Sequence, residues 1–329
     1  METIRIGIVG YGNVGRGVEL AVNANPDMRL AGVFTRRSPG SVTVMDASVP
    51  VMHVSEAAAR REDIDVMILA GGSATDLPVQ GPEFAAIFNI VDSYDTHAKI
   101  PEYFESVDRA ARGASRIAVI AAGWDPGLFS MNRVIAGALL PRGAGHTFWG
   151  RGVSQGHSDA IRRIRGVTGG VQYTIPNEEA IQRARSGESA GLSPKAMHFR
   201  DCYVVVEEGA DRARIEQEIQ TMPHYFADYE TRVTFVTREE LRAKHSSMPH
   251  GGFVIWSGKT GQEGSSNQVM EFSLKLDSNP EFTACVLVAY ARAAYRMHRE
   301  GQAGAKTVFD VPIGYLSPKS PAELRKELL

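Results

Sequence analysis

The sequence predicts an α/β protein in which a Rossmann-type parallel-sheet domain is followed by an α+β domain. Three observations predict this. Short, mainly apolar strand runs alternate with helical patterns over the first 120 residues, as in a parallel sheet covered on both faces. Further along, the run at 268–276 alternates apolar and polar residues, which is typical of an antiparallel sheet with one wet face. The length of 329 residues suits about two domains.

In the first domain, each expected strand is a short, mainly apolar run, and turn residues mark some of the breaks between elements. Asn25-Pro26, for example, ends the first helical pattern. The expected order is strand 4–9, helix 14–23, strands 30–35, 66–70 and 88–93, helix 101–112 and strand 117–121.

In the second domain, runs rich in β-branched residues predict strands at 202–207, 232–236, 253–256 and 268–276, a helix at 215–220, and loops at 186–193 and 258–266. After it, the alanine-rich segment 282–299 predicts a long helix, and 307–311 predicts a last strand that returns to the first domain. The predicted domains are 1–121, with 281–329 packing back on it, and 122–280.

The composition excludes several classes of protein. A net charge of -2 gives no basic field for nucleic acid, and two cysteines cannot build a disulfide scaffold or a cysteine zinc site. The nine histidines lack zinc-site spacing, so no metal is expected. No apolar run reaches the roughly 18 residues of a membrane span, and the first residues lack a signal-peptide pattern. We therefore expect a cytoplasmic protein that binds neither membrane nor nucleic acid.

The segment after the first strand matches G-x-G-x-x-G and opens a helix, which is the context that makes this motif informative. Gly10 permits a tight turn, Gly12 lets the backbone approach a pyrophosphate, and Gly15 lets helix and strand pack closely. The helix N-terminus supplies free N–H groups for phosphates. The alternative is an ordinary glycine turn.

The end of the second strand favours NADP over NAD as the cofactor. An NAD site usually has an acid here that binds the ribose 2′-hydroxyl. This chain instead has Thr35, Arg36 and Arg37, and two guanidinium groups can hold a 2′-phosphate. Two solvated loop arginines are the alternative.

Ligands of such sheets lie beyond the carboxyl ends of the strands. The small residues at 70–75 follow one strand end there, and two more strand ends are followed by Asp95 and Asp125, near the expected nicotinamide position. Each aspartate also suits a helix cap or a turn, and both roles can coexist. Nothing resembles a G-x-S-x-G elbow or a Walker A lysine.

Taken together, the segments GIVGYGNVGRGVE, GVFTRR, VDSYDTH, GWDPGLFSMNRV, HTFWGRGVSQGHSDAIRRI, VQYTIP, MPHGG and LDSNPEFTA resemble meso-diaminopimelate dehydrogenases over nearly the whole chain. The resemblance implies NADP-dependent oxidative deamination of the D-centre of meso-2,6-diaminopimelate, giving L-2-amino-6-oxopimelate, ammonia and NADPH. The reaction is reversible and belongs to diaminopimelate and lysine biosynthesis. The resemblance also implies a homodimer.

The resemblance places the site residues by motif. Its cofactor contacts are Gly10, Tyr11, Gly12, Asn13, Val14, Gly15, Thr35, Arg36, Arg37, Ala70, Gly71, Gly72, Ser73, Ser93, Tyr94, Ala122, Gly123, Trp124 and Pro126. Its substrate contacts are Asp95, Asp125, Trp149, Gln155, Gly156, Thr174, Arg200, His250 and Asn279. We expect Asp125 to bind the reacting amine and move its proton, with Asp95 in support. Trp149 is expected either to wall the pocket or to be a core residue.

Other functions remain open on the sequence. A broader D-amino acid dehydrogenase would keep the fold and change the substrate. A non-catalytic NADP(H)-binding sensor would need no substrate pocket, so the two aspartates argue against it. A dihydrodipicolinate reductase-like enzyme fits the first half of the chain, but the HTFWG and SQGHSDA segments fit it poorly.

Overall fold

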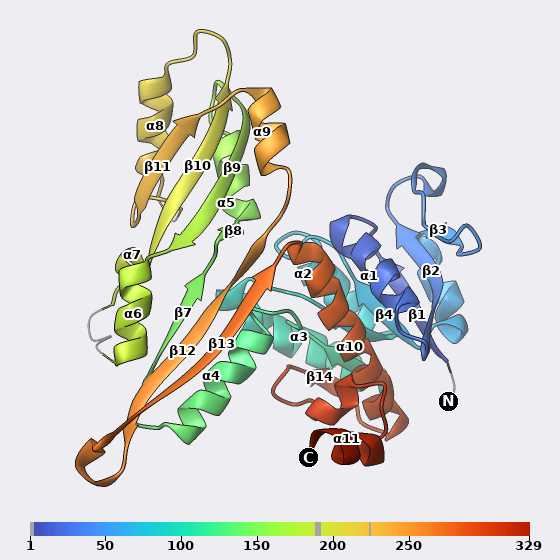
Figure 1. Cartoon of the computed structure of the whole chain (residues 1–329). Coiled ribbons are helices and arrows are strands. Elements are labelled where there is room, and N and C mark those ends of the chain that lie inside the picture. The colour runs from blue at the N-terminus through green and yellow to red at the C-terminus, as the bar shows by residue number, and fades with distance from the viewer. Residues whose placement is uncertain (1–2, 188–191, 224) are drawn as a thin grey trace. The chain divides into compact units, whose positions relative to one another are not determined.

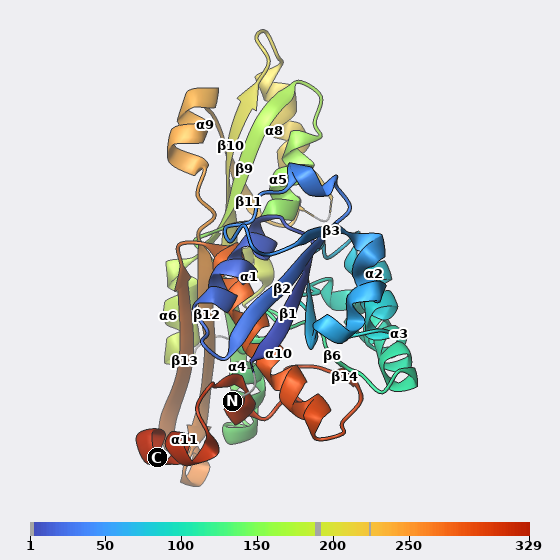
Figure 2. The same cartoon turned by 90° about the vertical axis from the view of Figure 1, so that its right-hand side faces the viewer.

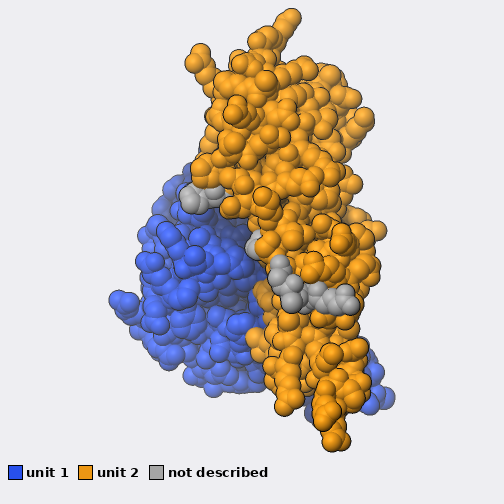
Figure 3. All heavy atoms as spheres, turned by 90° about the vertical axis from the view of Figure 1, so that its left-hand side faces the viewer, with its two compact units in different colours: residues 1–131, 280–329 blue, residues 132–279 orange. Residues whose placement is uncertain are grey.

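The computed structural model describes residues 3–187, 192–223 and 225–329, which divide into two compact units. Unit 1 comprises 1–131 and 280–329, and unit 2 comprises 132–279 (Figure 3). The boundaries predicted from the sequence fall at 121/122 and 280/281, whereas the two units meet at 131/132 and 279/280. The first of these observed boundaries falls inside α4 (Leu128–Leu139), a helix that no sequence pattern predicted.

Unit 1 is built on one parallel sheet with strand order β14-β6-β5-β4-β1-β2-β3 (Figures 1 and 2). Its strands are β1 (Ile4–Val9), β2 (Met28–Thr35), β3 (Val51–His53), β4 (Val66–Leu69), β5 (Asn89–Asp92), β6 (Ile117–Val119) and β14 (Gly304–Lys306). Its helices are α1 (Asn13–Asn23), α2 (Leu77–Ala85), α3 (Ile100–Gly113), α10 (Asn279–Arg299, whose first residue falls in unit 2) and α11 (Pro321–Leu328).

Both faces of this sheet are covered, as the apolar strand runs predicted. Val18 of α1 and Leu287 of α10 pack with Ile6 of β1 on one face. Phe84 of α2 and Val107 of α3 belong to a second cluster on the other face. The Rossmann-type sheet predicted from the sequence is therefore confirmed.

The structure corrects one strand of unit 1. The sequence predicted a strand at 307–311, but the strand that pairs with β6 is β14, which ends at Lys306. Thr307 begins a turn instead, because its N–H and hydroxyl both donate to Asp310 Oδ2, at 2.8 and 2.9 Å. The short strand β3 had no clear pattern in the sequence.

Unit 2 holds two further sheets, with strand orders β11-β10-β9-β8 and β13-β12-β7. The strands are β7 (Ala144–Trp149), β8 (Gly152–Val153), β9 (Val167–Pro176), β10 (His198–Val206), β11 (Glu230–Phe235), β12 (His250–Thr260) and β13 (Ser266–Leu276). The helices are α5 (Gln155–Arg162), α6 (Glu178–Ser186), α7 (Pro194–Met197), α8 (Arg212–Gln220) and α9 (Arg238–His245). Most of these strands pair antiparallel, and only β10 and β11 pair in parallel, which confirms an α+β domain.

The predicted loop at 258–266 is shorter than expected, because β12 and β13 extend into it from both ends. Thr260 still pairs with Ser266 across the β12–β13 hairpin, so only 261–265 form the turn. The ladder continues because Gly258 and Lys259 also have partners in β13. Of the predicted loop at 186–193, residues 188–191 lie outside the described part of the chain.

Candidate functional site

The glycine loop joins β1 to α1 at the carboxyl edge of the unit 1 sheet. Gly10 adopts a φ of +89°, which favours glycine, and its N–H donates to Phe34 O at 2.8 Å. A Cβ on Gly15 would lie 2.2 Å from Gly10 O, so this helix residue must also be glycine. Both requirements come from the turn itself, as predicted.

The first turn of α1 is suited to an anion. No side chain caps the helix at Gly12, and no acidic residue lies in its first turn. A Cβ on Gly12 would meet nothing within 4 Å, so the protein alone does not require glycine there. Open space beside uncapped N–H groups is what a pyrophosphate needs, and these residues therefore fit the dinucleotide. The buried Tyr11 hydroxyl donates to Glu19, which leaves only the Tyr11 backbone for the predicted cofactor contact.

The two arginines after β2 lie at this edge as well. Arg37 donates to Tyr11 O at 2.9 Å, and its N–H donates to Thr35 Oγ1 at 3.1 Å. The Arg36 side chain is 65% exposed, and its guanidinium pairs with Asp76 at 2.8 Å. The two arginines are thus ordered by contacts to the glycine loop and to the segment after β4. The exposed Arg36 side chain remains accessible to a 2′-phosphate.

The small residues after β4 are explained within the protein. A Cβ on Gly71 would lie 2.7 Å from Gln80 Oε1, and one on Gly72 would lie 2.7 Å from Thr75 Oγ1. Ser73 Oγ accepts the Asp95 N–H at 2.9 Å, which joins this segment to the loop after β5.

Asp92, the last residue of β5, was missed by the sequence analysis and organises the two aspartate loops. It is fully buried, and its Oδ1 accepts the N–H groups of Tyr94 and Ala121 at 2.9 and 3.1 Å. Its carbonyl oxygen accepts the Ala122 N–H at 2.9 Å, and its Oδ2 accepts the Tyr103 hydroxyl at 2.6 Å. Burial raises the pKa of Asp92 to about 6, despite these hydrogen bonds, which act to lower it.

Asp95 and Asp125 lie in the loops that Asp92 connects. Asp95 is exposed and Asp125 is half-buried. Trp124, beside Asp125, is only 7% exposed and packs edge-on to Phe129 at 5.2 Å. The Trp124 ring is therefore a core group, so its predicted cofactor contact falls to its backbone.

In unit 2, Arg200 on β10 and Thr174 on β9 are directly paired residues of adjacent strands. Both are buried, and the Arg200 guanidinium donates to Thr174 Oγ1 and lies over the Tyr229 ring at 3.9 Å. Arg200 Nε and Gln172 Oε1 are buried without a hydrogen-bond partner among the described residues. Burying a cation and leaving polar atoms unsatisfied is costly, which is typical of a site built for a polar ligand.

His157 on α5 adjoins this group and was not predicted. Its Nδ1 lies 2.7 Å from Ser154 Oγ, and its ring packs edge-on to Phe226. Burial, reinforced by the Arg200 charge, lowers the pKa of His157 to about 4, so it is neutral at pH 7. Nearby, α5 begins at Gln155, whose side chain lies outside the described part of the structure, and a Cβ on Gly156 would enter open space.

Trp149, at the end of β7, is 37% exposed, so the core interpretation of this residue is wrong. Its backbone N–H donates to His198 Nε2 at 2.9 Å, and the indole stacks on the His198 ring at 5.4 Å between centroids. The exposed indole is available to cover a ligand.

His250 begins β12, and its Nδ1 accepts the Gly251 N–H at 2.8 Å. A Cβ on Gly152 would lie 2.4 Å from His250 Nδ1, so Gly152 leaves the room that the imidazole needs. The Asn279 N–H donates to Met248 O at 3.0 Å, which ties the start of α10 to the His250 segment.

Within 3–187, 192–223 and 225–329, no group of three or more His, Cys, Asp or Glu residues is arranged to hold a metal ion. None of the helices in the described ranges is long and apolar enough to cross a membrane.

The chain is similar to several known proteins over its full length. Residues 123–278 match the diaminopimelic acid dehydrogenase C-terminal domain. The chain is 61% identical over 329 residues, covering 100% of both chains, to meso-diaminopimelate D-dehydrogenase of Ureibacillus thermosphaericus. It is 54% identical, with a TM-score of 0.94 over 99% of this chain and 100% of the other, to a six-substitution Clostridium tetani variant solved with DAP. An engineered D-amino acid dehydrogenase bound to NADP+ is 45% identical, with a TM-score of 0.87 over 99% of this chain and 100% of that one.

Proposed function

The chain belongs to the family of meso-diaminopimelate D-dehydrogenases, and on that premise we propose which of its residues carry each part of the reaction. The reaction is the reversible, NADP-dependent oxidative deamination of the D-centre of meso-2,6-diaminopimelate, in diaminopimelate and lysine biosynthesis. It gives L-2-amino-6-oxopimelate, ammonia and NADPH. One observation carries this function: the 61% identity extends over the full length of both chains.

The cofactor is held by unit 1. The α1 N-terminus and the glycine loop bind the pyrophosphate, and Arg36 and Arg37 bind the 2′-phosphate. When bound, NADP accepts the hydride that leaves the D-carbon. The protein's own task is to position that carbon and to move protons.

The aspartates after β5 and β6 bind the reacting amine. Asp125 takes the proton that the ammonium group must lose before hydride leaves, and Asp95 supports the amine's charge. Oxidation leaves a C=N bond; water then adds to its carbon and ammonia departs. The Asp92 hydrogen bonds support this role, because they fix the backbone of both loops from a single buried carboxylate.

Arg200 and Thr174 bind a substrate carboxylate, and His250 and Asn279 supply further polar contacts. The unsatisfied Arg200 Nε supports this, because a carboxylate would give the buried guanidinium its missing partner.

The six residues substituted in the Clostridium tetani variant are, in chain order, a Gln, a Thr, an Arg, a Pro, a His and an Asn. Gln155, Thr174, Arg200, Pro249, His250 and Asn279 give the same types in the same order, and the first five have the same spacing. Trp149 covers the substrate and excludes water.

We also propose that the chain acts as a homodimer in the cytoplasm. In α4, Val134, Ile135 and Leu139 are 54%, 50% and 64% exposed, and Val269 on β13 is 48% exposed. A second copy of the chain would bury these side chains. Light scattering of the native protein and of an Ile135→Asp variant tests this. The native protein should have twice the chain mass and the variant less, and a native monomer would refute the dimer.

The test of the function mixes the purified protein with NADP and the meso, LL or DD isomer of diaminopimelate at alkaline pH and follows absorbance at 340 nm. We expect a strong signal with the meso isomer, little with LL, and a much weaker response when NAD replaces NADP. No change in absorbance at 340 nm with any of the three isomers, in protein that still binds NADPH, would refute the reaction. D-lysine in parallel tests the broader D-amino acid activity, which the 45% identity to an engineered D-amino acid dehydrogenase makes worth measuring.

A further inference from the structure

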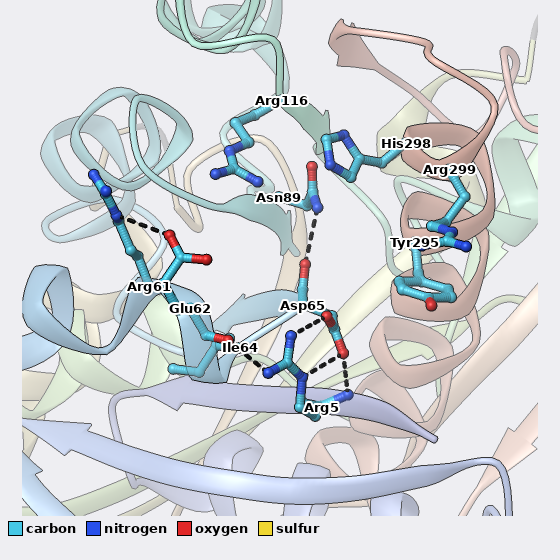
Figure 4. Close-up of a pocket in the computed structure, with 10 residues that line it drawn as sticks. All are labelled: Arg5, Arg61, Glu62, Ile64, Asp65, Asn89, Arg116, Tyr295, His298 and Arg299. Carbon is cyan, nitrogen blue, oxygen red and sulfur yellow. Dashed lines mark hydrogen bonds and ion pairs between the residues drawn. The ribbon is translucent and has the colours of Figure 1, made fainter. Parts of the chain in front are cut away.

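A pocket of about 220 Å³ opens at the amino ends of the unit 1 strands (Figure 4). Arg5 comes from β1, Asp65 directly precedes β4, and Arg116 directly precedes β6. His298 and Arg299, at the end of α10, complete the wall. The glycine loop lies at the carboxyl ends of the strands, where parallel sheets bind their ligands. Since this pocket lies at the amino ends, it is at the opposite edge of the sheet and is separate from the site already described.

The pocket has more positive than negative charge. Its four arginines face only two carboxylates, Asp65 and Glu62. Asp65 forms an ion pair with Arg5 at 2.7 Å, and Glu62 forms one with Arg61 at 3.1 Å. Two arginines are left over, and both acids are already paired.

The remaining cations are Arg116 and Arg299, neither of which has an ion-pair or hydrogen-bond partner for its side chain among the described residues. Figure 4 shows the Arg116 guanidinium turned toward the space between Glu62 and Asn89, with the His298 ring beside Asn89. His298 Nδ1 is buried without a partner among the described residues. Buried polar atoms are normally satisfied, so an unpaired one beside two unneutralised cations points to a missing anionic partner.

We propose that this pocket is a binding site for a phosphate-type dianion. Figure 4 shows Arg116 on the Asn89 side of the pocket and Arg299 across it, beside Tyr295. The Arg116 guanidinium can donate to two oxygens of such an anion at once, and Arg299 adds a second positive charge to the pocket. His298 gives a second contact from its ring nitrogen. Asn89 stays structural, because its amide donates to Asp65 O at 2.9 Å and accepts the Ile117 N–H at 3.0 Å. The pocket volume accommodates free phosphate together with water, or the phosphate group of a small ester.

The test uses protein saturated with NADP, so that the cofactor's own phosphate sites are filled. Inorganic phosphate is titrated by calorimetry and by thermal melting, against sodium chloride at equal ionic strength. Glycerol 3-phosphate in a parallel arm distinguishes free phosphate from a phosphate ester. We expect one phosphate per chain and a melting temperature that rises with phosphate concentration.

Arg116→Gln should weaken phosphate binding at least tenfold, and Arg299→Gln and Arg116→Lys should each weaken it less than Arg116→Gln. Arg109→Gln is the matched control, because Arg109 is an exposed arginine of α3 outside the pocket. It should bind phosphate like the native chain. Equal phosphate affinity in all four variants, or no melting shift beyond that of chloride, would overturn the proposal. Circular dichroism checks that each variant is folded.

Discussion

The hydroxyl of Tyr103 donates to Asp92 Oδ2 at 2.6 Å, and this bond joins α3 to the buried carboxylate that holds both aspartate loops. The Tyr103 ring also lies 4.1 Å, centroid to centroid, from Tyr94. Gly81 of α2 makes room for it, since a Cβ there would lie 2.1 Å from the Tyr103 hydroxyl. The loop geometry at the site therefore depends on packing behind the sheet edge.

Replacing Asp92 by Asn tests the buried charge through the pH dependence of stability. The pKa of Asp92 is about 6 in the fold, against an ordinary value of 3.8. Between these pH values the folded chain binds more protons than the unfolded chain, so native stability falls as pH rises through this window. The Asn side chain does not titrate, so the Asp92→Asn variant should not lose stability through this window. Urea unfolding from pH 4 to 8 should show the native chain losing stability relative to the variant up to about pH 7. A constant difference across that range would contradict the buried charge.

Replacing Tyr103 by Phe leaves Asp92 Oδ2 without its donor. Because the group is buried, we expect a loss of about 1–3 kcal/mol in the free energy of unfolding. The reaction rate should also fall, because the loops carrying Asp95 and Asp125 lose a support. Tyr315→Phe is the control: its hydroxyl donates to Glu300 at the same 2.6 Å, but at the surface. A loss in Tyr103→Phe no larger than in Tyr315→Phe would refute the role of this bond.

Arg36 and Arg37 are expected to set the preference for NADP. Losing a charge-assisted hydrogen bond to the 2′-phosphate weakens binding roughly 10- to 100-fold. Arg36→Ala and Arg37→Ala should therefore raise KM for NADP and change KM for NAD far less. Arg37→Ala should also affect NAD somewhat, because Arg37 holds Tyr11 O in the glycine loop. Steady-state kinetics with both cofactors, and Arg29→Ala as the exposed-arginine control, test this. Equal losses for NADP and NAD would refute the assignment.

Arg200→Met should raise KM for diaminopimelate by roughly 100-fold or more, because a buried charge-assisted pair to a carboxylate is lost. KM for NADP should stay within about twofold, since Arg200 lies in unit 2. Arg232→Met is the control: that guanidinium lies over the Phe199 ring on the neighbouring strand and is exposed. Unchanged KM for the substrate in Arg200→Met would rule out carboxylate binding there.

Motifs whose physics is local could be predicted from the sequence. The glycine loop is an example, because Gly10 and Gly15 are fixed by the turn they make. Asp92 could not be told from Asp95 in the segment VDSYDTH, because burial is decided by strands and helices far along the chain. The one available signal was position, since Asp92 closes an apolar run. His157 was missed for the same reason: Phe226 and Arg200, which set its environment, are distant in sequence.

An ion pair between Arg292 and Asp27 attaches α10 to the segment that leads into β2. Arg292 is 2% exposed, and its Nε donates to Asp27 at 2.6 Å, with further bonds to Asn25 and to Leu316 O. Asp27→Asn leaves this buried cation without its counter-charge, and the expected cost is about 3–5 kcal/mol in the free energy of unfolding. The Arg292 guanidinium holds the pKa of Asp27 below its usual range, so the native pair is at full strength above about pH 4 and weakens as pH falls further. The deficit of the variant should therefore be constant at neutral pH and shrink in acid. Glu218→Gln, which breaks the exposed Arg214 pair, is the control and should cost far less. A deficit in Asp27→Asn no larger than in that control would show that the pair does not anchor the helix.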